Sequence, residues 1–244
     1  MKIHLVALFQ RLDQIKTGLT LAFASSILSV SAQFTGKLVY EKDNKDSKLI
    51  MTYFQNGTKG RVEAYTLSPG KENTITNRQD TILFDFAAGH EIHLSNHAGR
   101  SLAIVTKYTL VIMDEVLSKQ TQVTTVQVLG QETINKYACT HYLLNHTMGG
   151  RSSNQKDIWI TRDIKGIPAV YVMGAYLYFT PGYAQFTKLT EAGGNGVVVR
   201  THDRTSGATM DLLSADFSTP SSSLLAIPGK YTIVDNSNRS VPSR

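Results

Sequence analysis

LIMTYFQNGTKGRVEAYT, residues 49–66, is the stretch that best defines the fold. Residues 49–55 are rich in aromatic and other strand-favouring side chains. Asn56-Gly57 follows, and both residues tolerate the positive φ angles of a tight hairpin turn. Residues 61–66 then return with alternating polar and apolar side chains, which is the period of a half-buried strand. The stretch predicts an antiparallel hairpin with one face toward a core.

The same alternation recurs along most of the chain. Phe34, Leu38 and Tyr40 share one face of another strand, and further short strands are predicted between turn residues, at 74–77, 81–86, 91–94, 101–107, 123–129, 138–145, 157–161, 197–201 and 209–217. Residues 109–119 and 169–179 each fit either a short helix or a strand. Because parallel pairing needs long crossovers and most gaps here are short, we expect antiparallel pairing. A sheet of this size must curl, close or split.

The first 32 residues have the features of a secretory signal peptide. A basic start is followed by an apolar or small-residue run at 17–29 and by the short side chains that a signal peptidase reads. We expect cleavage between Ala32 and Gln33. The run is too short to cross roughly 30 Å of hydrocarbon as a helix, which argues against a stable membrane span. The sequence therefore predicts a periplasmic or secreted protein.

Composition indicates one folded domain over residues 33–235, followed by a flexible polar tail at 236–244. Hydrophobic residues make up 41% of the chain and charged residues 18%, which disfavours disorder. The net charge is +6, but the basic residues are scattered and form no long run. This pattern argues against nucleic acid as a partner.

Cys139 is the single cysteine of the chain and cannot form an intramolecular disulfide. It lies in the strand-like run YACTHYLL, with no neighbour that marks it for activation. We therefore predict a buried packing role for its thiol.

Several short segments resemble a family of domains of unknown function in secreted Gram-negative proteins, which is similar to lipoprotein carriers of the LolA/LolB type. The segments are the opening strand FTGKL at 34–38, KGRVE at 59–63, LGQETINKYAC at 129–139, IWIT at 158–161 and IPGKY at 227–231. The resemblance implies a curved antiparallel sheet, an open half-barrel, with one or a few short helices on its concave side. It also implies that an apolar ligand or a lipidated partner binds between sheet and helices.

The histidines do not have the spacing of a metal site. His90, His93 and His97 lack the H-E-x-x-H arrangement, which places two ligands one helical turn apart. On a strand, His90 and His93 would point to opposite faces, and so would His141 and His146. We predict hydrogen-bonded or solvated strand histidines and no metal.

The chain shows no catalytic motif and no cofactor motif. It has no G-x-S-x-G elbow, and the glycine-rich segment at 193–196 lacks the lysine of a phosphate-binding loop. We therefore predict a non-enzymatic protein without a cofactor. Two alternatives remain open, which are a structural or interaction protein of the cell envelope and a hydrolase with an unrecognised site.

Aromatic side chains are the best sequence candidates for lining an apolar site. They are Trp159, Tyr171, Tyr176, Tyr178 and Phe179. The same residues would also suit an ordinary core, because aromatic side chains dominate core burial.

Overall fold

The fold is described from a computed structural model of the 244-residue chain. The structure describes residues 34–43, 47–67, 75–97, 99–107, 122–148, 153–166, 168 and 188–237. The expected signal peptide and its cleavage site at Ala32-Gln33 lie outside the described residues, as do segments 109–119 and 169–179.

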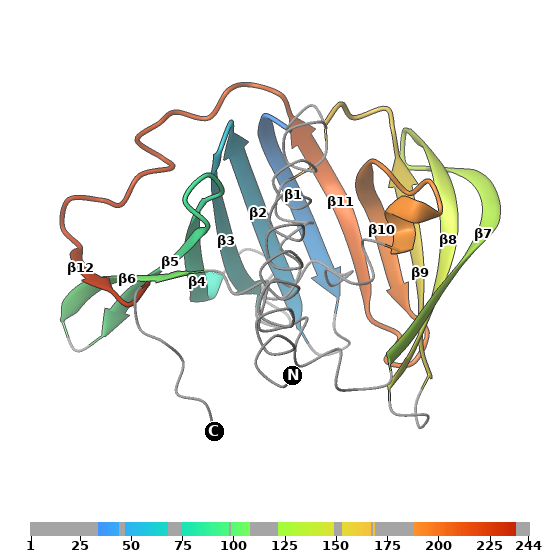
Figure 1. Cartoon of the computed structure of the whole chain (residues 1–244), viewed down its shortest axis with the longest axis horizontal. Coiled ribbons are helices and arrows are strands. Elements are labelled where there is room, and N and C mark those ends of the chain that lie inside the picture. Colours follow the sequence, from blue (N-terminus) through green and yellow to red (C-terminus); the bar gives the residue numbers. More distant parts are fainter. Residues whose placement is uncertain are drawn as a thin grey trace, which may run out of the picture. The chain divides into compact units, whose positions relative to one another are not determined.

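The described strands form one sheet of twelve (Figure 1). In chain order they are β1 Gly36–Asp43, β2 Lys48–Asn56, β3 Lys59–Leu67, β4 Ile75–Asp85, β5 His90–His97, β6 Arg100–Lys107, β7 Gln122–Ile134, β8 Tyr137–Met148, β9 Ser153–Thr161, β10 Val197–Asp203, β11 Thr209–Asp216 and β12 Thr232–Asp235. The predicted strands at 74–77 and 81–86 are therefore one strand, β4. The β12 strand was not predicted.

The sheet is curved and open, as expected. Its order is β12-β6-β5-β4-β3-β2-β1-β11-β10-β9-β8-β7, and the two outer strands, β12 and β7, do not pair with each other. Strand β1 lies in the interior of the sheet, between β2 and β11. Antiparallel strands extend the sheet on both sides of this junction (Figure 1).

One pairing corrects the expectation that all strands are antiparallel. Strand β12 runs parallel to β6. The reason is the long connection at 217–231, which follows β11 and reaches the far edge of the sheet along the ends of the intervening strands (Figure 1). Asn56 Nδ2 donates to Pro220 O of this connection at 3.3 Å, and Arg61 Nη1 donates to Leu224 O at 3.0 Å.

The hairpin of residues 49–66 forms as predicted, but its turn is one residue later. Asn56 pairs with Lys59, and the turn residues are Gly57, with a φ of 55°, and Thr58. Gly57 supplies the positive φ, so Asn56 stays in the strand. Its side chain is thereby free to reach the connection at 217–231.

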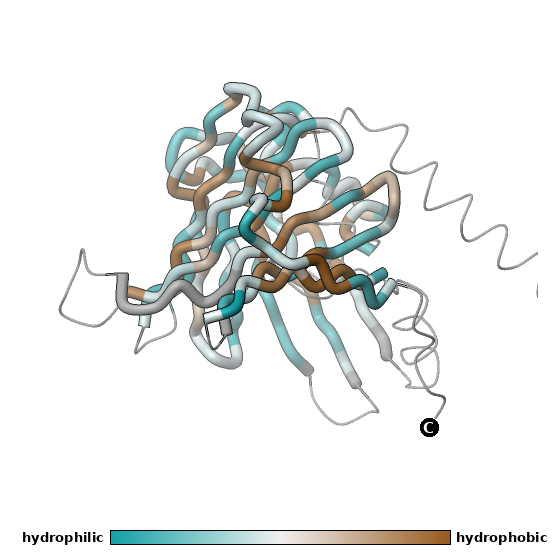
Figure 2. The backbone as a smooth tube through the Cα atoms, turned by 90° about the vertical axis from the view of Figure 1, so that its left-hand side faces the viewer, coloured by the Kyte–Doolittle hydropathy of each residue, from teal (hydrophilic) through white to brown (hydrophobic). Residues whose placement is uncertain are grey.

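One face of the sheet, called the inner face here, is apolar and shielded from solvent. On β1 to β3 it consists of Leu38, Tyr40, Met51, Tyr53, Val62 and Ala64, which are at most 2% exposed. The register places Leu38 opposite Tyr53, and Tyr53 opposite Val62. Figure 2 shows that hydrophobic residues recur along neighbouring strands of the sheet. The opposite side is called the outer face.

The described residues contain one helical turn, at 188–191. The chain that follows it packs on the inner face, because a side chain placed at Gly194 would lie 3.2 Å from Ile160 Cδ1. Leu189, within the turn, is fully buried. The expected short helix on this side of the sheet is thus present.

Candidate functional site

The inner face continues across the second half of the sheet. Tyr142, Leu144, Ile158 and Ile160 lie on it and are at most 4% exposed. The register places Tyr142 opposite Ile158 on the neighbouring strand. Strands from β1 to β4 and from β8 to β11 therefore contribute to one contiguous apolar surface.

Three buried polar side chains of this surface, those of Tyr40, Tyr53 and Gln55, are hydrogen-bonded within the chain itself. Tyr40 Oη donates to Val198 O at 3.0 Å. Tyr53 Oη donates to Gln55 Oε1 at 2.5 Å, and Gln55 Nε2 donates to Gly57 O at 3.1 Å. Because a buried polar group without a partner is costly, these bonds allow tyrosine and glutamine to sit in an apolar face.

Two lysines lie on the inner face near the end of the sheet that holds the β10–β11 turn. Lys42 has the same orientation as Leu38 and Tyr40 and pairs with Met210 on β11. Lys156 has the same orientation as Ile158 and pairs with Leu144 on β8. Both lysines are partly buried. Burial lowers the pKa of Lys156, Asp203 opposes this effect, and the positive charge of Lys42 lowers it further.

An ionisable pair occupies the inner face of β5. Glu91 lies opposite Phe84 and His93 lies opposite Ile82. The Glu91 side chain is 6% exposed, and its Oε1 contacts His93 Nε2. This carboxylate therefore has a partner on its own strand.

The outer face of β7 to β10 carries a polar cluster around Asp157. Arg204 donates to both carboxylate oxygens, from Nε at 2.6 Å and from Nη2 at 2.7 Å. His141 Nε2 lies 2.9 Å from Asp157 Oδ1, and His202 Nδ1 lies 3.5 Å from Oδ2. Burial alone would raise the pKa of Asp157, but hydrogen bonds and charges from Arg204 and His141 lower it below its ordinary value. The cluster fixes β8, β9 and the β10–β11 turn to one another.

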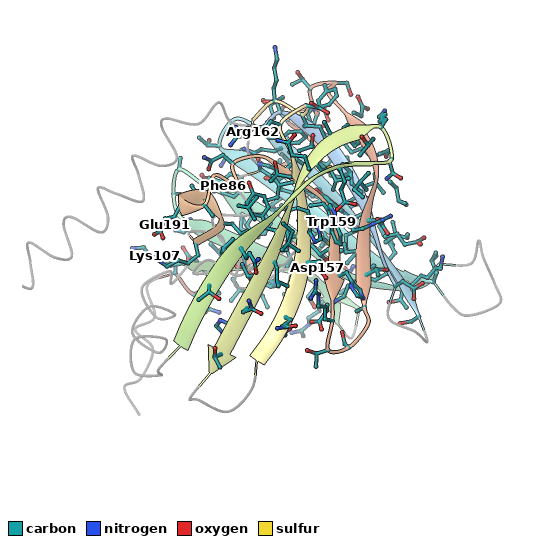
Figure 3. All side chains as sticks on the ribbon, turned by 90° about the vertical axis from the view of Figure 1, so that its right-hand side faces the viewer. Phe86, Lys107, Asp157, Trp159, Arg162 and Glu191 are labelled. Atoms are coloured by element: carbon teal, nitrogen blue, oxygen red, sulfur yellow. The ribbon has the colours of Figure 1, made fainter. Side chains whose placement is uncertain are left out.

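Trp159 belongs to this outer cluster. Its ring stacks on His141 with centroids 4.2 Å apart, and its Nε1 donates to Glu132 Oε1 at 2.6 Å. It lies next to Asp157 on β9, on the side away from Glu191 (Figure 3). The structure thus does not bring Trp159 to the inner face, and its role in binding a ligand stays a prediction. Tyr171, Tyr176, Tyr178 and Phe179 lie outside the described residues.

The predicted orientations of the histidines are found. His90 and His93 lie on opposite faces of β5, and His141 and His146 on opposite faces of β8. His146 Nδ1 lies 2.9 Å from Thr124 Oγ1. The described part of the chain contains no group of three or more His, Cys, Asp or Glu residues arranged to hold a metal ion.

Cys139 is buried, as predicted, with 3% of its surface exposed. Its Sγ donates to Tyr137 O at 3.4 Å. Burial raises the pKa of the thiol, which disfavours the reactive thiolate at neutral pH.

Sequence comparison assigns the chain to a family. The sequence model of the family described as "Domain of unknown function (DUF4412)" matches residues 34–231. The chain belongs to this family. No curated protein matches the chain. The DUF4412 match begins two residues before β1 and ends immediately before β12, so it includes all strands of the sheet but the last.

Solved structures resemble this DUF4412 chain distantly. MucB matches 86% of the chain with 7% identity and a TM-score of 0.39, and the chain spans 63% of the length of MucB. The Mycobacterium tuberculosis lipoprotein LppX matches 83% of the chain, and 96% of its own length, with 9% identity and a TM-score of 0.34. A LolA superfamily protein from Nitrosomonas europaea matches 84% of the chain, and 97% of its own length, with 12% identity and a TM-score of 0.29.

Sequence reasoning missed the two inner-face lysines. The signal was present, because Lys42 is two residues from Tyr40 and Lys156 is two residues from Ile158. Period-two alternation places such residues on the same face of a strand.

Among the described residues, no helical segment has the length and hydrophobicity needed to span a membrane.

Proposed function

We propose that this DUF4412 protein is an exported, non-enzymatic binding protein that holds an apolar ligand against the inner face of its sheet. The ligand is a lipid or the acyl chain of a lipidated partner protein. The signal-like segment at 1–32 supports a location in the periplasm or outside the cell.

The observation that supports this function best is the contiguous apolar inner face. It draws on eight of the twelve strands, and its central side chains, among them Leu38, Met51 and Ile158, are fully shielded. A single sheet must bury such a face against something else, because apolar surface in water is unfavourable. An acyl chain that lies against the inner face would keep it dry.

The energy available to such a ligand is large. Each buried CH₂ group contributes about 0.8 kcal/mol, so a twelve-carbon chain gains roughly 9 kcal/mol before the costs of ordering it. The site needs no polar residue for this gain. A carrier of this kind therefore requires no catalytic or metal-binding motif, in agreement with the sequence.

An uncharged fluorescent probe tests the proposal without any influence of a headgroup. The mature protein, freed of lipid, is titrated into N-phenyl-1-naphthylamine, and a saturable rise in fluorescence is expected. Native mass spectrometry of protein from its own host should show adducts with the mass of lipids. A protein that neither binds the probe nor retains an adduct would instead be a structural protein with a filled core.

A pair of variants locates the binding face. Ala64 is fully buried on the inner face of β3, whereas Thr52 lies on the outer face of β2, opposite Val39 and Glu63. We expect Ala64→Leu to weaken probe binding about tenfold, because an added side chain fills ligand space. Thr52→Leu should leave the affinity unchanged. Melting temperatures from circular dichroism show whether each variant is folded.

A further inference from the structure

Lys42 and Lys156 stand out because an apolar face is a costly place for an ammonium group. Lys42 is flanked by Leu49 on β2 and Met210 on β11. Lys156 is flanked by Leu144 on β8 and by Asp203 on β10. The register places both lysines on the same side of the sheet as the fully buried Tyr40 and Ile158.

Within the described part of the chain, neither lysine has a carboxylate within ion-pair distance. The neighbouring acidic side chain of Glu41 belongs to the outer face, where it pairs with Lys48 at 3.0 Å. The Asp203 carboxylate stabilises the β10–β11 turn, because its Oδ1 accepts hydrogen bonds from Thr205 N and Ser206 N at 2.9 Å each. This end of the inner face thus carries two positive charges against one carboxylate, that of Asp203, which lies opposite Lys156 and is within reach of its charge without forming an ion pair.

The two lysines also influence each other. Burial lowers the pKa of Lys156, and the charge of Lys42 lowers it further against the opposing effect of Asp203. Mutual repulsion of this kind is relieved by an anion that lies between the two amines. The arrangement therefore favours a bound negative group over an empty site.

We propose that Lys42 and Lys156 form an anion site that binds the negatively charged head of an amphiphile whose acyl chain lies on the inner face. This inference rests on the proposed function and adds the chemical class of the ligand, which is a carboxylate or a phosphate joined to an acyl chain. The inner-face acid Glu91 is already paired with His93 on the distant strand β5. Cationic heads are disfavoured at the lysine end by repulsion.

Displacement of N-phenyl-1-naphthylamine by ligands of equal chain length tests the head preference. Dodecanoate should displace the probe at a concentration about tenfold lower than dodecan-1-ol, because hydrogen bonds to charged groups are the stronger ones. Dodecylammonium should be the weakest competitor. The preference for dodecanoate should decrease at high ionic strength. Acetate and inorganic phosphate, which have no acyl chain, should not displace the probe.

Three variants assign the preference to the lysines. Lys42→Met and Lys156→Met keep the length of the side chain and remove its charge, and the double variant should bind dodecanoate and dodecan-1-ol equally. Lys37→Met is the matched control, because Lys37 is on the same strand as Lys42 but on the outer face, near the Phe54 ring. This variant should keep the preference for dodecanoate.

The outcomes separate the two proposals. Equal displacement by dodecanoate and dodecan-1-ol in the unmodified protein would overturn the anion site and leave the binding function intact. A double variant that is folded, as judged by its urea midpoint, and still prefers dodecanoate would do the same. Displacement by acetate or phosphate alone would show a site for small anions, not for amphiphile heads. Absence of probe binding in the unmodified protein would overturn the binding function itself.

Discussion

Replacement of Asp157 by asparagine tests how the outer cluster stabilises the sheet. The Asp157 side chain is 5% exposed, and its two oxygens receive two hydrogen bonds from Arg204 and one contact from His141. Asparagine is nearly isosteric but has no charge, and its amide N–H groups would face the donors of Arg204 or His141. The substitution isolates the carboxylate charge from packing.

The expected loss follows from the exposure of the partners. Removal of one member of a fully buried ion pair typically costs about 3–5 kcal/mol. This range is the upper limit for the loss expected from Asp157→Asn. Arg204 is 41% exposed and can regain water, so we expect a loss of about 2 kcal/mol in the free energy of unfolding at pH 7. Asp211→Asn is the matched control, because Asp211 pairs with Arg200 at 2.5 Å with side chains 30% and 37% exposed. It should cost less than about 1 kcal/mol.

The pH dependence gives an independent check. The pKa of Asp157 is lowered in the folded protein, so its stabilisation is complete above the unfolded pKa of about 4 and is lost as the pH falls through the lower folded value. The difference between the parent protein and Asp157→Asn should therefore be present at neutral pH and shrink below about pH 4. Urea unfolding followed by circular dichroism measures it. Equal losses for the Asp157 and Asp211 variants would refute the reasoning.

Three further predictions test separate parts of the structure. Gly36→Ala should lower stability by more than about 2 kcal/mol, because φ is +143° and the new Cβ would lie 2.3 Å from Asp216 O; Gly130→Ala, at a similar φ in open space, should cost about 1 kcal/mol, and similar urea midpoints would contradict this. Cys139 should react with Ellman's reagent only as fast as the protein unfolds, since the thiol is buried; rapid labelling under native conditions would show an accessible thiol. Lys156→Met should raise the free energy of unfolding at neutral pH, because the lowered pKa means that the folded state disfavours the charged amine. That gain should fade as the pH rises through the lowered pKa toward the unfolded one, and a gain that grows with pH would be inconsistent with this account.

The local pattern of the sequence was sufficient to predict most strands, because alternation and turn formation depend on only a few neighbouring residues. The hairpin of 49–66 was found in this way, and its turn was displaced by one residue only because Gly57 alone supplies the positive φ. Strand β12 escaped prediction. Its four residues are all exposed and have no alternation, and only pairing with the distant strand β6 makes them a strand.

In the candidate site, too, the local pattern predicts some features and long-range pairing decides the others. Alternation predicts that Tyr40, Lys42, Lys156 and Ile158 face the side of their strands that is buried. It does not tell which strands are neighbours, because the partner of each strand is fixed by long-range pairing. Trp159 follows the same alternation, since its position between the inner-face residues Ile158 and Ile160 places it on the outer face, where its aromatic character alone did not predict it.

The sequence by itself determined most of the strands, the alternation of faces along them and, through its family resemblance, a curved open sheet. The tertiary structure decided the strand order, the path of residues 217–231 and the placement of Lys42 and Lys156 at the same end of the inner face. The physical reason is the distance along the sequence over which each interaction acts. Side-chain direction depends on the backbone period of two within a strand, whereas the relative placement of β1 and β9, which are separated by β11 and β10, depends on how the whole sheet pairs and bends.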